Sequence, residues 1–85
     1  MEVGDIVISL KGHDATQPFV IVAQVNAEFV LIANGTSRGI ANPKLKRKRH
    51  LRAAEPSGIT ALTDAKLAKR IKQFKSDRRL YAEKR

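Results

Sequence analysis

Short apolar segments separated by turn-forming residues dominate the N-terminal part of the chain and limit it to a small β structure. Residues 3–10 alternate, which places Ile6, Ile8 and Leu10 on one face of a predicted strand. Residues 11–18 then break the alternation with polar and turn-forming side chains. The chain therefore begins as a strand followed by a loop.

Two further strands are predicted at residues 19–25 and 28–33, joined by Asn26-Ala27 as a hairpin turn. Both segments are apolar on both faces, whereas a sheet with one wet face alternates more cleanly between apolar and polar residues. We therefore expect another element to cover the outer face of the sheet.

The dipeptide Asn34-Gly35 predicts a type I′ turn, because both central positions of that turn need a positive φ. A short fourth strand is expected at residues 37–41, and the segment that follows Pro43 would close the set as a fifth. Four or five short strands joined by tight turns predict a mainly β fold, either a small antiparallel barrel or a strongly bent sheet.

The hydrophobic pattern changes in the last third of the chain. Residues 55–59 have the composition of a linker, and residues 60–85 follow a helical period. Thr63 or Asp64 is suited to cap the start of this helix. One face of the helix is apolar apart from Arg78, and it holds Leu67, Ile71, Phe74 and Tyr81.

The predicted organisation is thus a barrel at 1–54, a linker at 55–59 and a basic amphipathic C-terminal α-helix at 60–85. A chain of 85 residues forms one domain with a small core. The apolar stripe of the helix is expected to cover the outer sheet face or a partner.

Charge is distributed unevenly along the chain. There are 17 lysines and arginines against 8 acids, a net charge of +9. Residues 1–35 hold one basic residue and four acids, a net −3, so residues 36–85 carry the remaining +12. Such asymmetry points to a basic face that binds nucleic acid or an anionic membrane. Aromatic residues are few, which disfavours a stacking platform for single-stranded bases.

The densest charge lies in residues 44–52, KLKRKRHLR, with six basic residues, one histidine and no acid. In an extended segment, alternate side chains share an edge, and Leu45 and Leu51 would anchor the run by pointing inward. The candidate phosphate ligands on one edge are Lys44, Lys46, Lys48, His50 and Arg52, and those on the other are Arg47 and Arg49.

Other basic residues would extend this run. Arg38 and Lys11 lie near it if the barrel folds as predicted. A second basic surface is expected on the helix, from Lys69, Arg70, Lys72, Lys75 and Arg79. A solvated edge strand protected by its lysines, an anionic membrane and an acidic protein partner are the alternatives for the run.

No catalytic constellation is present in the sequence. His13 and His50 are the only histidines, and the absence of cysteine excludes disulfides and thiolate metal sites. The acids show no paired spacing, and no glycine-rich phosphate loop occurs. We expect a binding protein that is not an enzyme and uses no metal or cofactor.

The N-terminal residues are acidic and polar, where a secretory signal would be basic and then apolar. The apolar runs at 19–23 and 29–33 are too short to cross a bilayer. A cytoplasmic protein without membrane attachment is expected.

Residues 2–9 (EVGDIVIS), Gly12 and residues 19–25 (FVIVAQV) resemble a KOW motif, a strand–loop–strand unit of ribosomal proteins and transcription elongation factors. Residues 30–35 (VLIANG) and 43–51 (PKLKRKRHL) are similar to eukaryotic and archaeal large-subunit ribosomal KOW proteins, and more so to their small bacterial stand-alone relatives. The resemblance covers roughly residues 2–53 and implies an SH3-like barrel, RNA binding and association with the ribosome.

The loop at 11–18 departs from the KOW pattern. KOW loops commonly carry a basic residue and a second glycine after the first, whereas here Gly12 is followed by His13 and Asp14. Asp14 has the wrong charge for a phosphate contact, which leaves Lys11 and His13 as the loop's candidates.

The sequence thus predicts non-enzymatic binding of structured RNA, ribosomal RNA in the first place, through phosphate contacts and shape. Ribosomal proteins are expected as possible further partners. The alternatives are a protein–protein interaction module of the translation or transcription machinery, and DNA binding, because phosphates are common to both nucleic acids.

Overall fold

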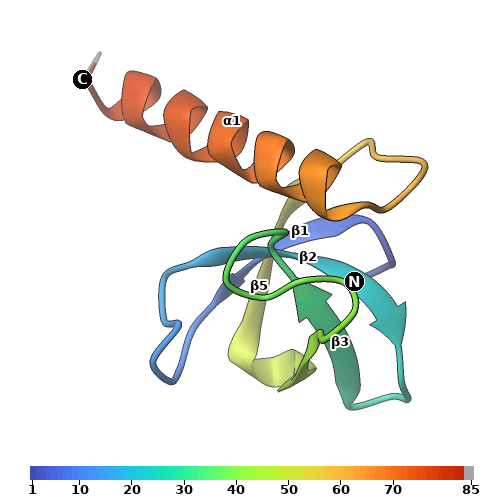
Figure 1. Ribbon diagram of the computed structural model, residues 1–85. Helices are drawn as coiled ribbons and strands as arrows, with labels where there is room; N and C mark the ends of the chain where they lie inside the picture. The colour runs from blue at the N-terminus through green and yellow to red at the C-terminus, as the bar shows by residue number, and fades with distance from the viewer. Residues whose placement is uncertain (84–85) are drawn as a thin grey trace.

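The computed structural model describes the backbone of residues 1–83 and the side chains of residues 1–78. It is a five-stranded antiparallel sheet, bent into a small SH3-like barrel, with one helix lying across it (Figure 1). The strand order is β4-β3-β2-β1-β5. The elements are β1 (Asp5–Ser9), β2 (Pro18–Gln24), β3 (Phe29–Ala33), β4 (Lys44–Arg47), the 3₁₀ turn η1 (Lys48–His50), β5 (Leu51–Pro56) and α1 (Asp64–Glu83).

Register shifts in two strands help the sheet to bend. One lies between Ile6 and Val7, where β1 pairs with β5, and the other between Ile21 and Ala23, where β2 pairs with β3. Such irregularities increase the local twist of a strand. They allow five short strands to coil around an interior instead of forming a flat sheet.

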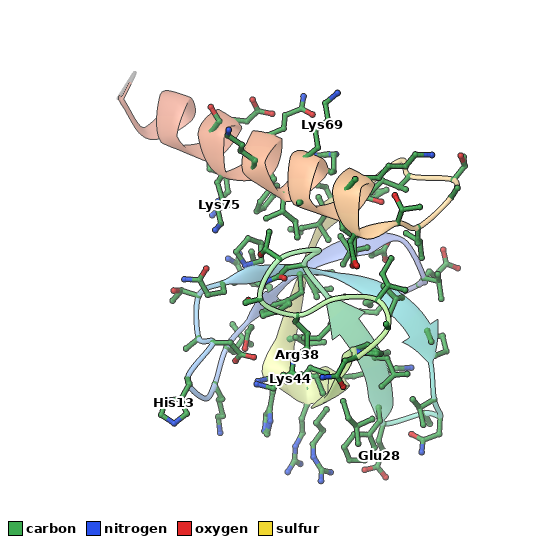
Figure 2. All side chains as sticks on the ribbon, viewed as in Figure 1. His13, Glu28, Arg38, Lys44, Lys69 and Lys75 are labelled. Atoms are coloured by element: carbon green, nitrogen blue, oxygen red, sulfur yellow. The ribbon has the colours of Figure 1, made fainter. Side chains whose placement is uncertain are left out.

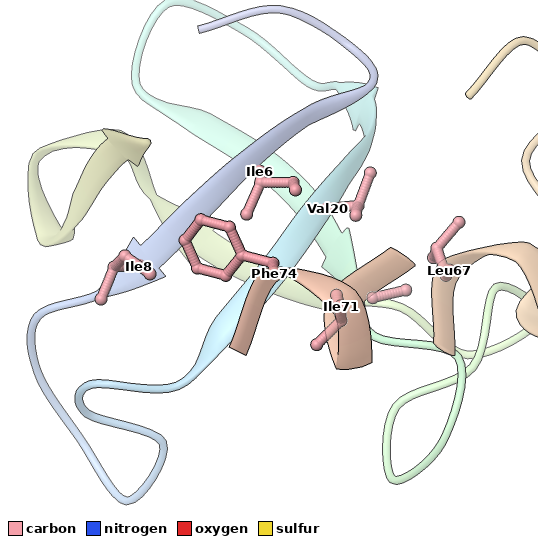
Figure 3. Close-up of a cluster of buried hydrophobic side chains, with 7 residues drawn as sticks. Ile6, Ile8, Val20, Leu67, Ile71 and Phe74 are labelled. Carbon is pink, nitrogen blue, oxygen red and sulfur yellow. The ribbon is translucent and has the colours of Figure 1, made fainter. Parts of the chain in front are cut away.

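Both faces of the sheet are buried, as the sequence predicts. The interior of the barrel is filled by Val7, Phe19, Ile21, Val30, Ile32 and Leu51. The outer face contributes Ile6, Ile8, Val20 and Ala33 to a second cluster, which α1 covers with Leu67, Ile71 and Phe74 (Figure 3).

The helix is therefore held on the barrel by the predicted stripe. Burying a side chain the size of leucine, isoleucine or phenylalanine contributes roughly 1.5–3 kcal/mol. An isolated helix of this length is only marginally stable in water. The side chain of Tyr81, also predicted for the stripe, lies outside the described side chains.

The predicted boundaries at 54 and 60 both shift toward the C terminus. β5 continues through Pro56, because Glu55 pairs with Ile6 and Pro56 with Asp5. α1 begins at Asp64, and the Thr63 hydroxyl accepts a hydrogen bond from Lys66 N at 3.3 Å, which makes Thr63 the cap. The connection between β5 and α1 is thus residues 57–63.

The strand predicted at 37–41 is wrong, because residues 34–42 form turns and bends. Asn34 Oδ1 accepts hydrogen bonds from Thr36 N and Arg38 N, each at 2.9 Å. Ile40 N donates to Asp64 Oδ1 at 2.8 Å. These side-chain acceptors replace the hydrogen bonds that a strand would have made, so Asn34-Gly35 starts a folded loop between β3 and β4 in place of a two-residue hairpin turn.

The loop between β2 and β3 forms the expected hairpin with a longer turn than predicted. It spans residues 25–28, and Asn26 Oδ1 accepts hydrogen bonds from Glu28 N and Phe29 N at 2.8 and 2.9 Å. Leu10, which the alternation places with Ile6 and Ile8, lies beyond the end of β1 and is 49% exposed.

Gly35 sits directly beneath the first turn of α1. Its φ is +81°, and a Cβ there would collide with Asp64 O and lie 2.7 Å from Ala68 N. Gly58 has a similar φ of +77°, but a Cβ at that position would meet nothing within 4 Å. A side chain at either position would strain the backbone, but only a side chain at Gly35 would also collide with the helix.

We predict that Gly35→Ala destabilises the protein far more than Gly58→Ala. Positive φ alone costs about 1–2 kcal/mol for an L-residue, and overpacking against the helix backbone raises the cost of Gly35→Ala to roughly 3–4 kcal/mol. Urea denaturation followed by circular dichroism measures both. Equal losses of unfolding free energy in the two variants would show that α1 does not press on Gly35.

Candidate nucleic-acid interface

The basic run is divided among three structural elements. Residues 44–47 form β4, residues 48–50 form η1, and β5 begins at Leu51. The turn is fixed at both ends, because Lys48 N donates to Glu28 O at 2.7 Å and Leu10 N donates to His50 O at 2.9 Å. Since the run is not extended throughout, the predicted division of its side chains between two edges does not hold.

Lys46 points toward the barrel and not toward solvent. The register of β3 and β4 pairs Val30 with Lys46 and Leu31 with Leu45. Because cross-strand partners share a face, Lys46 follows buried Val30 inward and is only 8% exposed, while Leu45 turns outward and is 54% exposed. The prediction that Leu45 points inward is wrong for this reason; the same prediction for Leu51 is confirmed.

Asp14 receives the inward-pointing lysines. Its two carboxylate oxygens lie 3.0 Å from Lys46 Nζ and 2.7 Å from Lys44 Nζ. Ser9 Oγ donates to Asp14 Oδ1 at 2.7 Å, and Lys46 Nζ also donates to Lys11 O at 2.8 Å. We call the group of Asp14, Ser9, Lys44 and Lys46 the Asp14 anchor.

The charge of the anchor is set by its hydrogen bonds. Burial opposes ionisation of Asp14, but the hydrogen bonds from Lys44, Ser9 and Lys46 outweigh it and hold the pKa of that carboxyl well below its usual range. Asp14 is therefore fully ionised at neutral pH. Two of the six basic residues in the run are thus occupied in holding the β1–β2 loop against β4.

Arg47 is partly engaged at the barrel surface. Its Nη1 lies 3.1 Å from Glu28 Oε2, and its guanidinium carbon lies 4.7 Å from the centre of the Phe29 ring. The Glu28 side chain is 68% exposed, so this ion pair contributes less than about 1 kcal/mol. Arg47 can exchange Glu28 for another anion at little cost.

The turn η1 carries the cations that remain available. Lys48 and Arg49 make no ion pair with any residue whose side chain is described. Lys11 is exposed close by. Figure 2 shows Lys44, His13 and Glu28 at this end of the barrel, which is the end away from α1. We call this region the η1 surface, defined by Lys11, Arg47, Lys48, Arg49 and His50.

The pKa of His50 is affected by the positive charges gathered around it. Partial desolvation together with the positive charges of Lys11, Arg49, Arg47 and Lys46 lowers the pKa of His50 below its ordinary value. The imidazole is therefore neutral at pH 7, and it adds hydrogen-bonding groups, not charge, to the η1 surface. A bound polyanion would reverse this shift.

Arg52 does not belong to the η1 surface. It pairs with Ile8 across β1 and β5, so it points to the sheet face that α1 covers. There it lines a cavity of about 650 Å³ with Lys75 and Arg78 of the helix. Arg38 is half buried in the Asn34 loop and makes no ion pair with the described residues.

The predicted basic residues of the helix have different roles. Lys69, Lys72 and Lys75 are exposed, and Figure 2 shows Lys69 and Lys75 projecting from α1. Arg70 instead ties the helix to the barrel, because its Nε donates to Ser57 O at 3.0 Å and its Nη2 pairs with Glu55. The side chain of Arg79 lies outside the described side chains.

Sequence reasoning missed that the acids Asp14 and Glu28 hold the basic run. It named Lys75 as part of a second basic surface but did not place Lys75 and Arg78 beside Arg52. The signal for Asp14 was its place as the one acid of the loop at 11–18. Its partner Lys44 is 30 positions away in the sequence, and only the folded register brings the two together.

Within the described part of the chain, no group of three or more histidines and acids could hold a metal ion. None of the helices in that part combines the length and the apolar composition needed to cross a membrane. The sequence matches no protein-family model and no curated protein.

We predict that Asp14→Ala lowers the unfolding free energy by on the order of 3 kcal/mol, because Lys46 would remain buried without its counter-charge. Glu28→Ala is the matched control, since it removes an acid that pairs with Arg47 of the same basic run at an exposed site, and its cost is below about 1 kcal/mol. Urea denaturation at pH 7 compares them. Equal small losses of unfolding free energy in the two variants would contradict the stabilising role of the Asp14 anchor.

Acid should remove the contribution of Asp14 selectively. Because its folded-state pKa is depressed, the stabilisation is complete above the unfolded value of about 3.9 and is lost as the pH falls through the folded-state pKa. The stability difference between wild type and Asp14→Asn should therefore shrink below about pH 4. A difference that stays constant with pH would show that the Asp14 charge does not stabilise the fold.

Proposed function

We propose that this chain is a KOW-type barrel that binds structured RNA, ribosomal RNA in the first place, in the cytoplasm and without catalysing a reaction. The observation that carries the proposal is the η1 surface, where Lys48 and Arg49 stand on a short fixed turn without acid partners among the described side chains. Arg47 and Lys11 flank them.

A rigid turn is a favourable place for phosphate ligands. Backbone hydrogen bonds from Lys48 N to Glu28 O and from Leu10 N to His50 O fix η1 on the barrel, so binding does not have to order the backbone that carries its cations. Each phosphate that they neutralise releases condensed counterions, which favours binding. Phosphate and 2′-hydroxyl contacts suit duplex RNA, whose base edges in the major groove are out of reach.

A protein partner is supported by a different feature. β4 is an edge strand of the sheet and carries Leu45, which is 54% exposed, opposite the partly exposed Leu31. An exposed apolar pair on a sheet edge can receive a segment of another protein. A ribosomal protein bound at this edge is compatible with RNA on the η1 surface.

We predict that Lys48→Ala/Arg49→Ala weakens RNA binding and reduces the slope of log affinity against log salt by roughly 2, one for each phosphate that the variant no longer neutralises. The control Lys48→Arg/Arg49→Lys keeps both charges and should keep the slope. Fluorescence anisotropy with a labelled RNA hairpin over a series of KCl concentrations measures it. An unchanged slope in the alanine variant would contradict phosphate binding at η1.

Crosslinking in cells, followed by sequencing of the recovered nucleic acid, tests the class of partner. Ribosomal RNA is the expected product, and its recovery should fall in the Lys48→Ala/Arg49→Ala variant. Recovery of DNA in place of RNA would contradict the proposal of RNA binding and identify DNA as the ligand. Recovery of a protein partner without nucleic acid would overturn the proposal in favour of an interaction module.

A further inference from the structure

A cleft lies where the end of β1 and the loop after it meet the C-terminal half of α1. Its volume is about 650 Å³, within the range of roughly 300–1,000 Å³ typical of ligand sites. We call it the helix–barrel cleft. Its walls combine apolar and basic side chains, chief among them Leu10, Pro18, Phe74, Arg52, Lys75 and Arg78.

The charge of the cleft points to an anionic ligand. Arg52 comes from β5, whereas Lys75 and Arg78 come from α1 about one helical turn apart. None of the three makes an ion pair with a residue whose side chain is described, and no acid among residues 1–78 lines the cleft. Cations brought together from separate elements repel one another unless an anion relieves them.

The cleft also offers a flat surface. The guanidinium of Arg78 lies over the Phe74 ring, 5.3 Å from its centre, and Phe74 itself is buried in the outer cluster beside Ile8 (Figure 3). The outer face of the guanidinium is therefore the plane that a ligand can reach. Bases of unpaired nucleotides stack on such arginine planes. Leu10, 49% exposed, supplies apolar contact at the rim.

The loop wall of the cleft is held in an unusual conformation. Thr16 has a φ of +71°, which is rare for a β-branched residue, and its backbone N donates to Ser9 O at 2.7 Å. Strained residues of this kind cluster at ligand sites. Thr16 and Gln17 line the cleft, and their side chains carry a hydroxyl and an amide, groups that can hydrogen-bond to the edge of a base.

We propose that the helix–barrel cleft binds one unpaired nucleotide of the RNA, with its phosphate between Arg52 and Lys75 and its base against Arg78 and Leu10. This inference rests on the proposed function and narrows it, because the ligand becomes an RNA with a bulged or looped-out nucleotide. Arg52 is two residues from His50, at most about 7 Å along the chain, so one RNA can contact both the cleft and the η1 surface.

The test compares two RNA hairpins that differ by a single bulged 2-aminopurine. Stacking of one base strengthens binding about tenfold, so wild-type protein should prefer the bulged hairpin by about that factor, and the fluorescence of the 2-aminopurine should change on binding. Arg52→Ala/Arg78→Ala should remove the preference, so that the variant binds the two hairpins with affinities within about twofold of each other, because it lacks both the phosphate ligand and the stacking plane of the cleft.

Two further variants keep the result interpretable. Leu10→Glu places an acid at the exposed rim and should also abolish the preference, without touching the buried face of α1. Lys66→Ala is the matched control, because it removes a charge from the same helix outside the cleft and should retain the preference. Circular dichroism melting confirms that each variant is folded.

The outcomes separate this inference from the proposed function. Equal affinity of the wild type for the two hairpins overturns nucleotide binding in the cleft and leaves the proposal of RNA binding in place. Binding of neither hairpin overturns both. Displacement of the 2-aminopurine hairpin by a glutamate-rich peptide that binds more tightly than the RNA would assign the cleft to an acidic protein partner. That result would overturn the proposal that the cleft binds a nucleotide.

Discussion

The ion pairs of Asp14 determine both the shape of the barrel end and the charges that it presents. One ionised carboxylate holds Lys44 and Lys46, which are separated from it by 30 and 32 positions in the sequence. It thereby fastens the loop after β1 to β4. The same contact explains why a lysine can follow Val30 into the barrel, since a buried charge needs a partner and hydrogen bonds. Without Asp14, the charges of Lys44 and Lys46 would be uncompensated and would add to the repulsion within the basic run.

The fold also gathers cations at two separate places. The η1 surface lies at the end of the barrel away from α1 (Figure 2), and the helix–barrel cleft lies between the barrel and the helix. α1 therefore does more than cover the outer sheet face with Leu67, Ile71 and Phe74. It brings Lys75 and Arg78 to Arg52, a residue that the sequence groups with the basic run.

Local patterns in the sequence were sufficient to predict the elements that depend on neighbouring residues. The apolar strands, the covering helix and its stripe follow from periodicities of two and 3.6, which residues close in sequence establish. The strand expected at 37–41 failed because Asp64 captures Ile40 N from across the fold. Leu45 was assigned to the wrong face because the sequence does not show how β3 and β4 pair. A shift of one residue in that pairing would turn every side chain of the strand to the opposite face. The cleft could not be predicted, since it depends on where α1 crosses β1.

The central claim is that Lys46 is a structural residue while Lys48 is a ligand for phosphate, and the side-chain ammonium groups report on this directly. In ¹⁵N-labelled protein titrated with an RNA hairpin, the Lys46 ammonium signal should be protected from solvent exchange and unchanged by RNA, because it is held by Asp14 and Lys11 O. The Lys48 signal should shift as RNA is added. An RNA-induced shift of Lys46, with Lys48 unaffected, would contradict the account.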